Sequence, residues 1–349
     1  MSTIPTTLNS RSLPYTVVGG SKGRSGAGLA ARGPEPASSA AGGAAGGAAS
    51  SPLGVGTWSV SVLLLNRGSR LYRPEVFKEL DRLGFDSILS VEEGPEGRDV
   101  ESLVGRFPQS RFLLLSERAS PGEMLNIGMR ESSGSFVFVL WSDMRLSTQG
   151  LSSRFFERIA EQDILCQAPF LSARSGESLP SAAAPALQRA SLKVLSLPPA
   201  RDGTRSLFPF DYCGIYSREK FVLLGGFDAT LESAYWQKLD FGFRAWLWGE
   251  EIRLAQALKV NYVDDVPSED STPDEYYKWF WLKNLAPVFR GDSSVIPRSR
   301  FWAYLRRRQG SPFAAYSEFR SARDWVRLNK YRFRQGAASL VDLWEDESA

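Results

Sequence analysis

The sequence of 349 residues contains no histidine, only two cysteines and no apolar run long enough to cross a membrane. The absence of histidine excludes Ser-His-Asp and Cys-His hydrolases, zinc or iron sites with histidine ligands, and catalysis by an imidazole general base. Cys166 and Cys213 are too few for a zinc site or a disulfide framework, so we expect both to be core residues. Acid–base chemistry is therefore left to carboxylates, lysine or tyrosine. No basic-then-apolar leader opens the chain, which favours a cytoplasmic protein.

The charges are nearly balanced, with 42 basic and 39 acidic residues. This balance is not typical of a dedicated nucleic-acid-binding protein, and nucleic acid is not the partner we expect. The basic excess is local, because residues 298–334 contain 11 basic and two acidic residues interleaved with aromatic ones. Such a segment either makes peripheral contact with an anionic membrane or packs through its aromatic rings with the arginines in water.

Composition divides the chain into three parts. Residues 1–57 hold 12 of the 31 glycines and show no helical or strand period, which predicts a disordered Ala/Gly/Ser/Pro-rich tail. Residues 58–270 carry the regular apolar patterning of a folded domain. Residues 271–349 are predicted to form a basic, aromatic helical extension.

Within 58–270, buried strands alternate with helices. Strands are predicted at 59–65, 87–91, 111–115 and 135–140, and helices at 74–83 and 121–131. Ser120, Pro121 and Glu123 have the spacing of a capping box at the start of the second helix. This alternation predicts an α/β fold with a mostly parallel sheet and helices on both faces.

Polar residues follow three of these strands, in the pairs Asn66-Arg67, Glu92-Glu93 and Ser142-Asp143. Carboxyl ends of parallel strands share one edge of a sheet, where such folds bind ligands. We therefore expect the three pairs to converge. Residues 172–206, rich in Ala, Ser and Pro, are predicted to form a long surface loop over that edge, as lids do.

The order and spacing of these pieces resemble the family 2 glycosyltransferases of the GT-A fold, over about Ser59 to Asp265. Val91-Glu92-Glu93-Gly94 is similar to that family's Val-Asp-Asp-Gly, and Leu140-Trp141-Ser142-Asp143 to its Leu-Asp-Ser-Asp. Further matches are Asn126-Ile127-Gly128, Gly225-Gly226-Phe227-Asp228 and the segment from Trp236 to Arg244. The family's counterpart of that segment is Glu-Asp-x-(Asp/Glu)-(Leu/Phe)-x-x-Arg. The resemblance implies a GT-A, Rossmann-like sheet.

The resemblance also implies a nucleotide sugar as substrate, with Mn²⁺ or Mg²⁺ as cofactor on Asp143 and transfer to a hydroxyl of a glycan, lipid-linked intermediate or protein. The donor-nucleotide candidates it gives are Asn66, Arg67, Glu92, Asn126, Asp143 and Arg145. Glu92 falls where the family reads the base or ribose. The fixed cationic fork of Arg145 is suited to neutralising diphosphate, with a solvated arginine as the alternative.

Departures from the family pattern weaken the expected chemistry. Trp141 replaces the first metal-motif Asp, so we expect only a weak metal site. Gln237-Lys238 replaces the usual Glu-Asp, which puts a lysine where the base should stand. Asp240 is then either the substitute base or an i,i+4 partner of Arg244.

The acceptor and sugar side has two further candidates, Trp236 and Lys238. Trp236 either stacks on a sugar face or is a core residue. Two functions stay open at this point: an active glycosyltransferase of the hexosyltransferase type, or a catalytically inactive GT-A domain that acts as a binding or scaffolding module.

Overall fold

The computed structural model describes residues 13–20, 59–67, 73–93, 100–147, 151–188, 191–307 and 311–348. In these residues, a nine-stranded sheet has the strand order β1-β4-β3-β2-β5-β10-β7-β11-β6. Its strands are β1 (Tyr15–Gly19), β2 (Val60–Leu65), β3 (Ser87–Glu93), β4 (Ser110–Leu115), β5 (Phe136–Trp141), β6 (Met144–Ser147), β7 (Cys166–Ser172), β10 (Gly214–Ser217) and β11 (Ile252–Tyr262).

The segment β4-β3-β2-β5 of this sheet is parallel. β2 pairs in parallel with both β3 and β5, and β3 with β4, because α1 (Arg73–Leu83), α2 (Val100–Arg106) and α3 (Pro121–Glu131) supply the crossovers. β2 is buried at every residue, as its uninterrupted apolar sequence predicts. The chain places β3 and β4 on one side of β2 and then β5 on the other. The point where the winding changes direction therefore lies between β2 and β5.

The second half of the sheet is mixed. β10 is antiparallel to β5 and to β7, β11 is parallel to β7, and β6 is antiparallel to β11. α4 (Ser153–Gln162), α5 (Arg218–Leu224) and α6 (Ala234–Leu247) connect these strands. The predicted strands and helices are confirmed to within two residues, and both halves of the capping box at Ser120 and Glu123 are formed. Cys166 and Cys213 are buried free thiols, as expected.

Two sequence predictions are wrong. Part of the tail predicted to be disordered forms β1, which pairs antiparallel with β4 at the sheet edge and anchors Leu13 in the core. The rest of that tail lies outside the described residues. Residues 172–206 do not form a lid loop; they contain the hairpin β8 (Ala182–Gln188) and β9 (Ser191–Leu197). The small alanines of the hairpin pack into an apolar cluster with α6 and α10. Burial of these apolar side chains stabilises the hairpin relative to a solvent-exposed loop.

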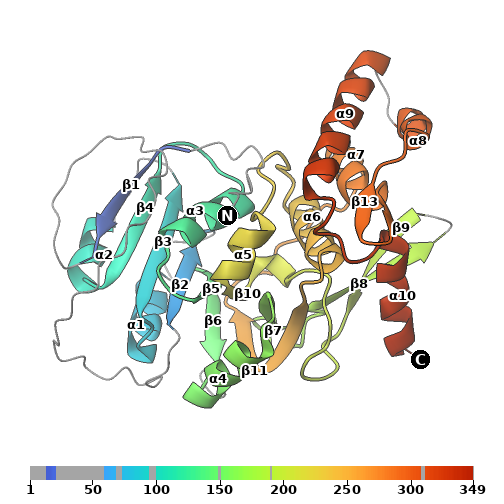
Figure 1. Cartoon of the computed structure of the whole chain (residues 1–349). Helices are drawn as coiled ribbons and strands as arrows, with labels where there is room; N and C mark the ends of the chain where they lie inside the picture. The colour runs from blue at the N-terminus through green and yellow to red at the C-terminus, as the bar shows by residue number, and fades with distance from the viewer. Residues whose placement is uncertain are drawn as a thin grey trace, which may run out of the picture.

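The C-terminal elements pack around α6 on the side away from β1 to β4 (Figure 1). They are α7 (Glu275–Phe280), a π-helical segment (Trp281–Leu285), the hairpin β12 (Val288–Arg290) and β13 (Ser293–Val295), α8 (Arg300–Arg307), α9 (Pro312–Asn329) and α10 (Ala337–Ser348). α6 is buried from Trp236 to Leu247, because it lies between the sheet and this layer. The predicted α/β sheet with a helical C-terminal extension is confirmed. In the part of the chain that the structure describes, no helix has the length and apolar character of a membrane span.

Candidate functional site

The three polar strand ends converge at one edge of the sheet, as predicted. Asn66 Nδ2 donates to Glu92 Oε1 over 3.0 Å, and Arg67 Nε donates to Asp143 Oδ2 over 2.9 Å. Ser142 Oγ links the β5–β6 turn to the end of β2 by donating to the Arg67 carbonyl over 3.1 Å. The ends of β2 and β3 and the β5–β6 turn thus form one polar site at the point where the winding of the sheet changes direction.

Arg67 binds a second carboxylate that the sequence analysis did not identify. Its Nη1 donates to Asp211 Oδ1 over 2.8 Å, and its Nη2 lies 2.5 Å from Asp211 Oδ2. Burial opposes the charge of Arg67, but the hydrogen bonds and charges of Asp211 and Asp143 outweigh it and raise the pKa of the guanidinium above its ordinary value. One cation thus bridges two carboxylates, which leaves the cluster with a net negative charge.

Backbone geometry explains why Asp211 escaped detection from sequence. Asp211 and Tyr212 have φ angles of 51° and 61°, in the left-handed region that non-glycine residues rarely adopt. Residues held in this region cluster at functional sites, where the surroundings offset the strain. Phe210-Asp211-Tyr212 matches no motif. The one sequence signal for Asp211 is an acidic residue shortly before a strand that begins with a glycine.

Two aromatic residues complete the surroundings of Arg67. The guanidinium carbon lies 4.3 Å from the centre of the Trp141 ring, whose Nε1 donates to the Asp211 carbonyl over 2.8 Å. The Tyr262 hydroxyl donates to Asp211 Oδ2 over 2.8 Å, and burial raises the pKa of this phenol well above its ordinary value. Trp141 therefore stacks under the cation and holds Asp211 in place.

The residues present do not fit a divalent cation. Hard cations take six or more oxygens, whereas this site offers Asp143 and Asp211, and Arg67 occupies both carboxylates. In the described ranges, no group of three or more His, Cys, Asp or Glu side chains is suited to hold a metal ion. The weak metal site implied by the resemblance thus has an internal arginine in its place.

Two buried acceptors at the site lack a protein donor. Asn66 Oδ1 and Asp143 Oδ1 have no hydrogen-bond partner in the described part of the chain. The orientation of the Asn66 amide is fixed, because its Nδ2 donates to Ser90 Oγ, the Val91 carbonyl and Glu92. Buried acceptors are normally satisfied, so these two atoms can accept hydrogen bonds from a water or from the hydroxyl or N–H groups of a ligand.

Asn126 and Gln237 hold the surrounding elements together. Asn126 forms two hydrogen bonds with the backbone of Phe227, at 2.8 and 2.9 Å. Gln237 is fully buried: its Oε1 accepts from the Gly122 amide and the Tyr212 hydroxyl, and its Nε2 donates to Ser120 Oγ and the Asp228 carbonyl. An amide can donate and accept at once, which explains a glutamine where the family has glutamate.

Asp240 lies in a fully buried ion cluster. Its Oδ2 accepts from Arg244 Nη2 over 3.1 Å, and its Oδ1 lies 2.8 Å from both Lys283 Nζ and Asn284 Nδ2. Lys283 also pairs with Asp228 over 2.8 Å. Of the two alternatives for Asp240, the pair with Arg244 is present, and two cations with opposing carboxylates balance the cluster.

Lys238 occupies an aromatic cage beside the polar site. The ammonium lies 5.4, 5.5 and 5.3 Å from the ring centres of Phe208, Phe210 and Tyr212, and it pairs with Glu269. The lysine side chain is fully buried, whereas the Glu269 side chain is partly exposed. A lysine replaces the family's acidic residue here because a cation is stabilised by ring faces that would disfavour a carboxylate.

Two candidates lie away from the polar cluster. Trp236 is buried among Tyr235, Tyr277 and Phe280, and its indole donates to the Thr272 carbonyl. Arg145 faces α1, where Glu75 and Glu79 lie 3.4 and 3.8 Å from its guanidinium.

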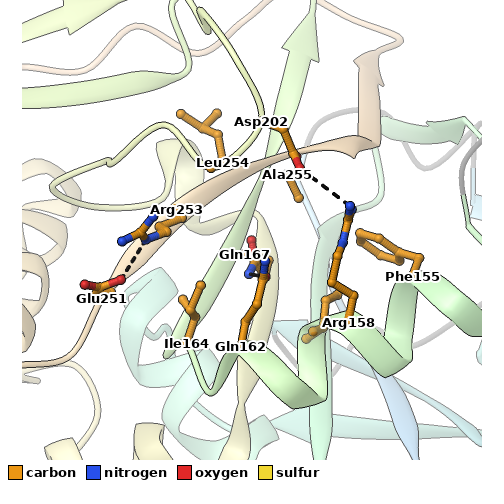
Figure 2. A pocket seen from close by; sticks show the side chains of 12 residues that line it. Phe155, Arg158, Gln162, Ile164, Gln167, Asp202, Glu251, Arg253, Leu254 and Ala255 are labelled. Carbon is orange, nitrogen blue, oxygen red and sulfur yellow. Dashed lines mark hydrogen bonds and ion pairs between the residues drawn. The ribbon is translucent and has the colours of Figure 1, made fainter. Parts of the chain in front are cut away.

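A separate pocket of about 200 Å³ lies at the amino ends of β7 and β11, against α4 (Figure 2). Arg158 points toward Asp202 at 3.7 Å, and Arg253 pairs with Glu251 at 2.6 Å. β7 and β11 run away from this pocket toward the edge that carries Asp143. The pocket is therefore at the opposite end of the sheet from the polar site.

Comparison with solved structures identifies the fold. The chain is similar to GalNAc-T7, solved with UDP, GalNAc and Mn²⁺, with a TM-score of 0.50 and 13% sequence identity over 65% of this chain. The match spans half of the GalNAc-T7 chain. A structure of S. aureus TarS with UDP-GlcNAc matches with a TM-score of 0.45 and 12% identity over 76% of this chain and 71% of that one. No protein-family model and no curated protein matches the sequence. The GT-A fold implied by the resemblance is confirmed.

Proposed function

We propose that the chain binds a nucleoside diphosphate sugar at the carboxyl ends of β2, β3 and β5 and transfers the sugar to a hydroxyl of a glycan, lipid-linked intermediate or protein. One observation carries this proposal: Arg67 and Asp143 meet where the winding of the sheet changes direction. Open α/β sheets bind their ligands at this point. Two further atoms support it: Asn66 Oδ1 and Asp143 Oδ1 are unsatisfied acceptors, and each can accept a hydrogen bond from a hydroxyl of a ribose or sugar.

Each residue of the site has a distinct role in the proposal. Asn66 and Glu92 contact the nucleoside, because Asn66 turns its free carbonyl to the edge while Ser90 and Asn66 orient the Glu92 carboxylate. Arg67 pairs with the diphosphate, which offers the same bidentate geometry as the carboxylates it now holds. Asp143 and Asp211 orient that arginine and engage three of its five N–H groups, and the remaining two donate to phosphate oxygens. Divalent metal is not required for this binding.

The other candidates position the site and do not touch the donor. Asn126 fixes the Gly-Gly-Phe-Asp turn through the Phe227 backbone, and Arg145 ties β6 to α1. Trp236 is a core residue of the C-terminal layer. Asp240 stabilises the buried ion cluster, because both of its oxygens are engaged and its side chain is fully buried.

A specific observation favours a second function, a GT-A domain that binds ligand without transferring a sugar. Lys238 stands where the family has its base, and a protonated lysine cannot accept the acceptor's proton. Glu269, the carboxylate next to this ammonium, is engaged in an ion pair with it. A binding or scaffolding module needs the polar site but no base.

A thermal-shift panel on the full chain tests both functions. UDP, GDP, CDP and TDP sugars are compared with Mn²⁺ and with EDTA, UDP sugars first because GalNAc-T7 was solved with UDP. We expect one nucleotide to raise the melting temperature equally under both conditions. Release of free nucleotide from the bound donor then supports transferase chemistry, and binding without release supports the module. No shift with any nucleotide overturns both.

A further inference from the structure

Exposed aromatic side chains lie near the starts of α8 and α9. Trp302, Phe313 and Tyr316 are 65%, 87% and 59% exposed, whereas most large apolar residues of the described chain are buried. Figure 1 shows α8 and α9 as outlying elements of the C-terminal layer, far from β1 to β4. Largely exposed rings on neighbouring helices are typical of an interaction surface.

These three rings belong to one surface. The Phe301 ring lies 5.8 Å from that of Trp302 and 6.0 Å from that of Tyr316, so it joins the two helices. Phe313 and Tyr316 are three residues apart on α9 and therefore share a face. We name Trp302, Phe313 and Tyr316 the aromatic patch.

Exposed arginines flank the aromatic patch. Arg306 is one turn from Trp302, and its Nε donates to the Trp302 carbonyl; Arg320 is one turn from Tyr316. In residues 298–307 and 311–320, Glu318 is the sole acidic residue, and the Tyr304 hydroxyl donates to it. Asp324 lies 4.0 Å from Arg320, but basic residues outnumber acidic ones over residues 298–324, so the charge next to the patch is positive on balance.

We propose that the aromatic patch and its arginines bind an anionic membrane surface. Trp and Tyr favour the bilayer interface, a phenylalanine inserts among the acyl chains, and arginines attract anionic headgroups. Nucleic acid is the other anionic partner, but the near-balanced charge of the whole chain disfavours it. This surface is independent of the nucleotide site, so the failure of either proposal leaves the other standing.

Vesicle co-sedimentation of the full chain tests the proposal. We expect binding to phosphatidylcholine vesicles that contain about one third phosphatidylserine, little binding to phosphatidylcholine alone, and release as salt rises. The double variant Trp302→Ser/Phe313→Ser should bind about tenfold more weakly. Arg306→Gln and Arg320→Gln should each weaken binding about fivefold.

Matched controls come from the other end of α9. Leu328→Ser and Arg327→Gln alter exposed residues outside the patch, so they should bind vesicles like the unmodified chain. Equal losses in the patch and control variants would overturn the proposal. Equal binding to neutral and anionic vesicles would overturn it as well. Tight binding to a single-stranded RNA, without binding to either vesicle, would assign the patch to nucleic acid instead.

Discussion

Arg67 Nε donates to Asp143 Oδ2 over 2.9 Å, so the carboxylate at the position that resembles a metal-motif Asp is bound to an arginine from the end of β2. Asp143 also has a buried oxygen without a protein donor in the described residues. The pair therefore combines a neutralised charge with a free acceptor, which suits the hydroxyl donor of the proposed ligand.

Replacing Arg67 by Gln should cost stability and nucleotide binding together. Asp143 and Asp211 would remain buried without their cation, and breaking such a pair costs about 3 kcal/mol in the free energy of unfolding. Urea unfolding measures that cost, and the thermal-shift panel measures binding. Arg158→Gln is the matched control, because Arg158 and its partner Asp202 are both exposed and such a pair contributes less than about 1 kcal/mol. Equal costs for the two variants would argue against the Arg67 cluster.

Replacing Asp143 by Asn should distinguish metal-free from metal-dependent nucleotide binding, because the two predict opposite changes in affinity. If Arg67 pairs with the diphosphate, removing one competing carboxylate should strengthen nucleotide binding by several-fold in EDTA. If a cation on Asp143 is required, the same change should weaken binding, and only when Mn²⁺ is present. Titration calorimetry under both conditions gives the answer. Weaker binding in EDTA would contradict the role proposed for Arg67.

The sequence was informative where local chemistry determines structure. The capping box at Ser120 and Glu123 formed as its spacing predicts, since both partners are three residues apart. The convergence of Asn66, Arg67 and Asp143 also followed, because parallel strand ends must share an edge.

Long-range partners were beyond sequence reasoning. Asp211 reaches Arg67 across 144 residues through a left-handed backbone that no propensity predicts. The cage around Lys238 uses rings from a segment about 30 residues upstream, and Glu269 comes from about 30 residues downstream. β1 was missed because a five-residue edge strand gains its stability from pairing with β4.

Replacing Gln237 by Glu restores the residue type of the family but should destabilise this chain. A glutamate oxygen would face the Asp228 carbonyl, to which the amide now donates over 3.1 Å. The buried charge and lost donor should cost about 2 kcal/mol in the free energy of unfolding. Urea unfolding tests this against Gln256→Glu, which changes an exposed glutamine and should cost little. A stable Gln237→Glu variant would refute the explanation given for this glutamine.

Asp228 should make stability depend on acid pH. Burial raises its pKa, but Lys283 and the hydrogen bonds from Thr230 outweigh burial, so the pKa in the folded state lies below the ordinary value of 3.8. The unfolded chain therefore binds a proton more readily, and this contribution is full above about pH 5 and is lost as pH falls through and below 3.8.

Asp228→Asn should reduce the free energy of unfolding at pH 7 by about 3 kcal/mol, because Lys283 loses one of its two carboxylates. The variant should also lose less stability than the unmodified chain between pH 5 and pH 3. Urea unfolding across this range gives both curves. Parallel curves would show that Asp228 is not the source of the acid sensitivity.

Gly242 on α6 positions the segment that carries the site. A Cβ there would lie 2.0 Å from the Leu207 carbonyl oxygen and 3.0 Å from the Phe208 Cβ, so Gly242→Ala should push this backbone away from the helix. Phe208 is part of the Lys238 cage, and Asp211 follows three residues later. We expect a loss of about 3 kcal/mol in the free energy of unfolding, together with weaker nucleotide binding. Gly105→Ala on α2 is the control. Apart from the helix's own backbone, no atom of the described residues lies within 4 Å of its added Cβ, and alanine is the better helix former by about 1 kcal/mol. Thermal unfolding should therefore shift in opposite directions for the two variants, and a shared direction would show that close approach at Gly242 does not hold the site in place.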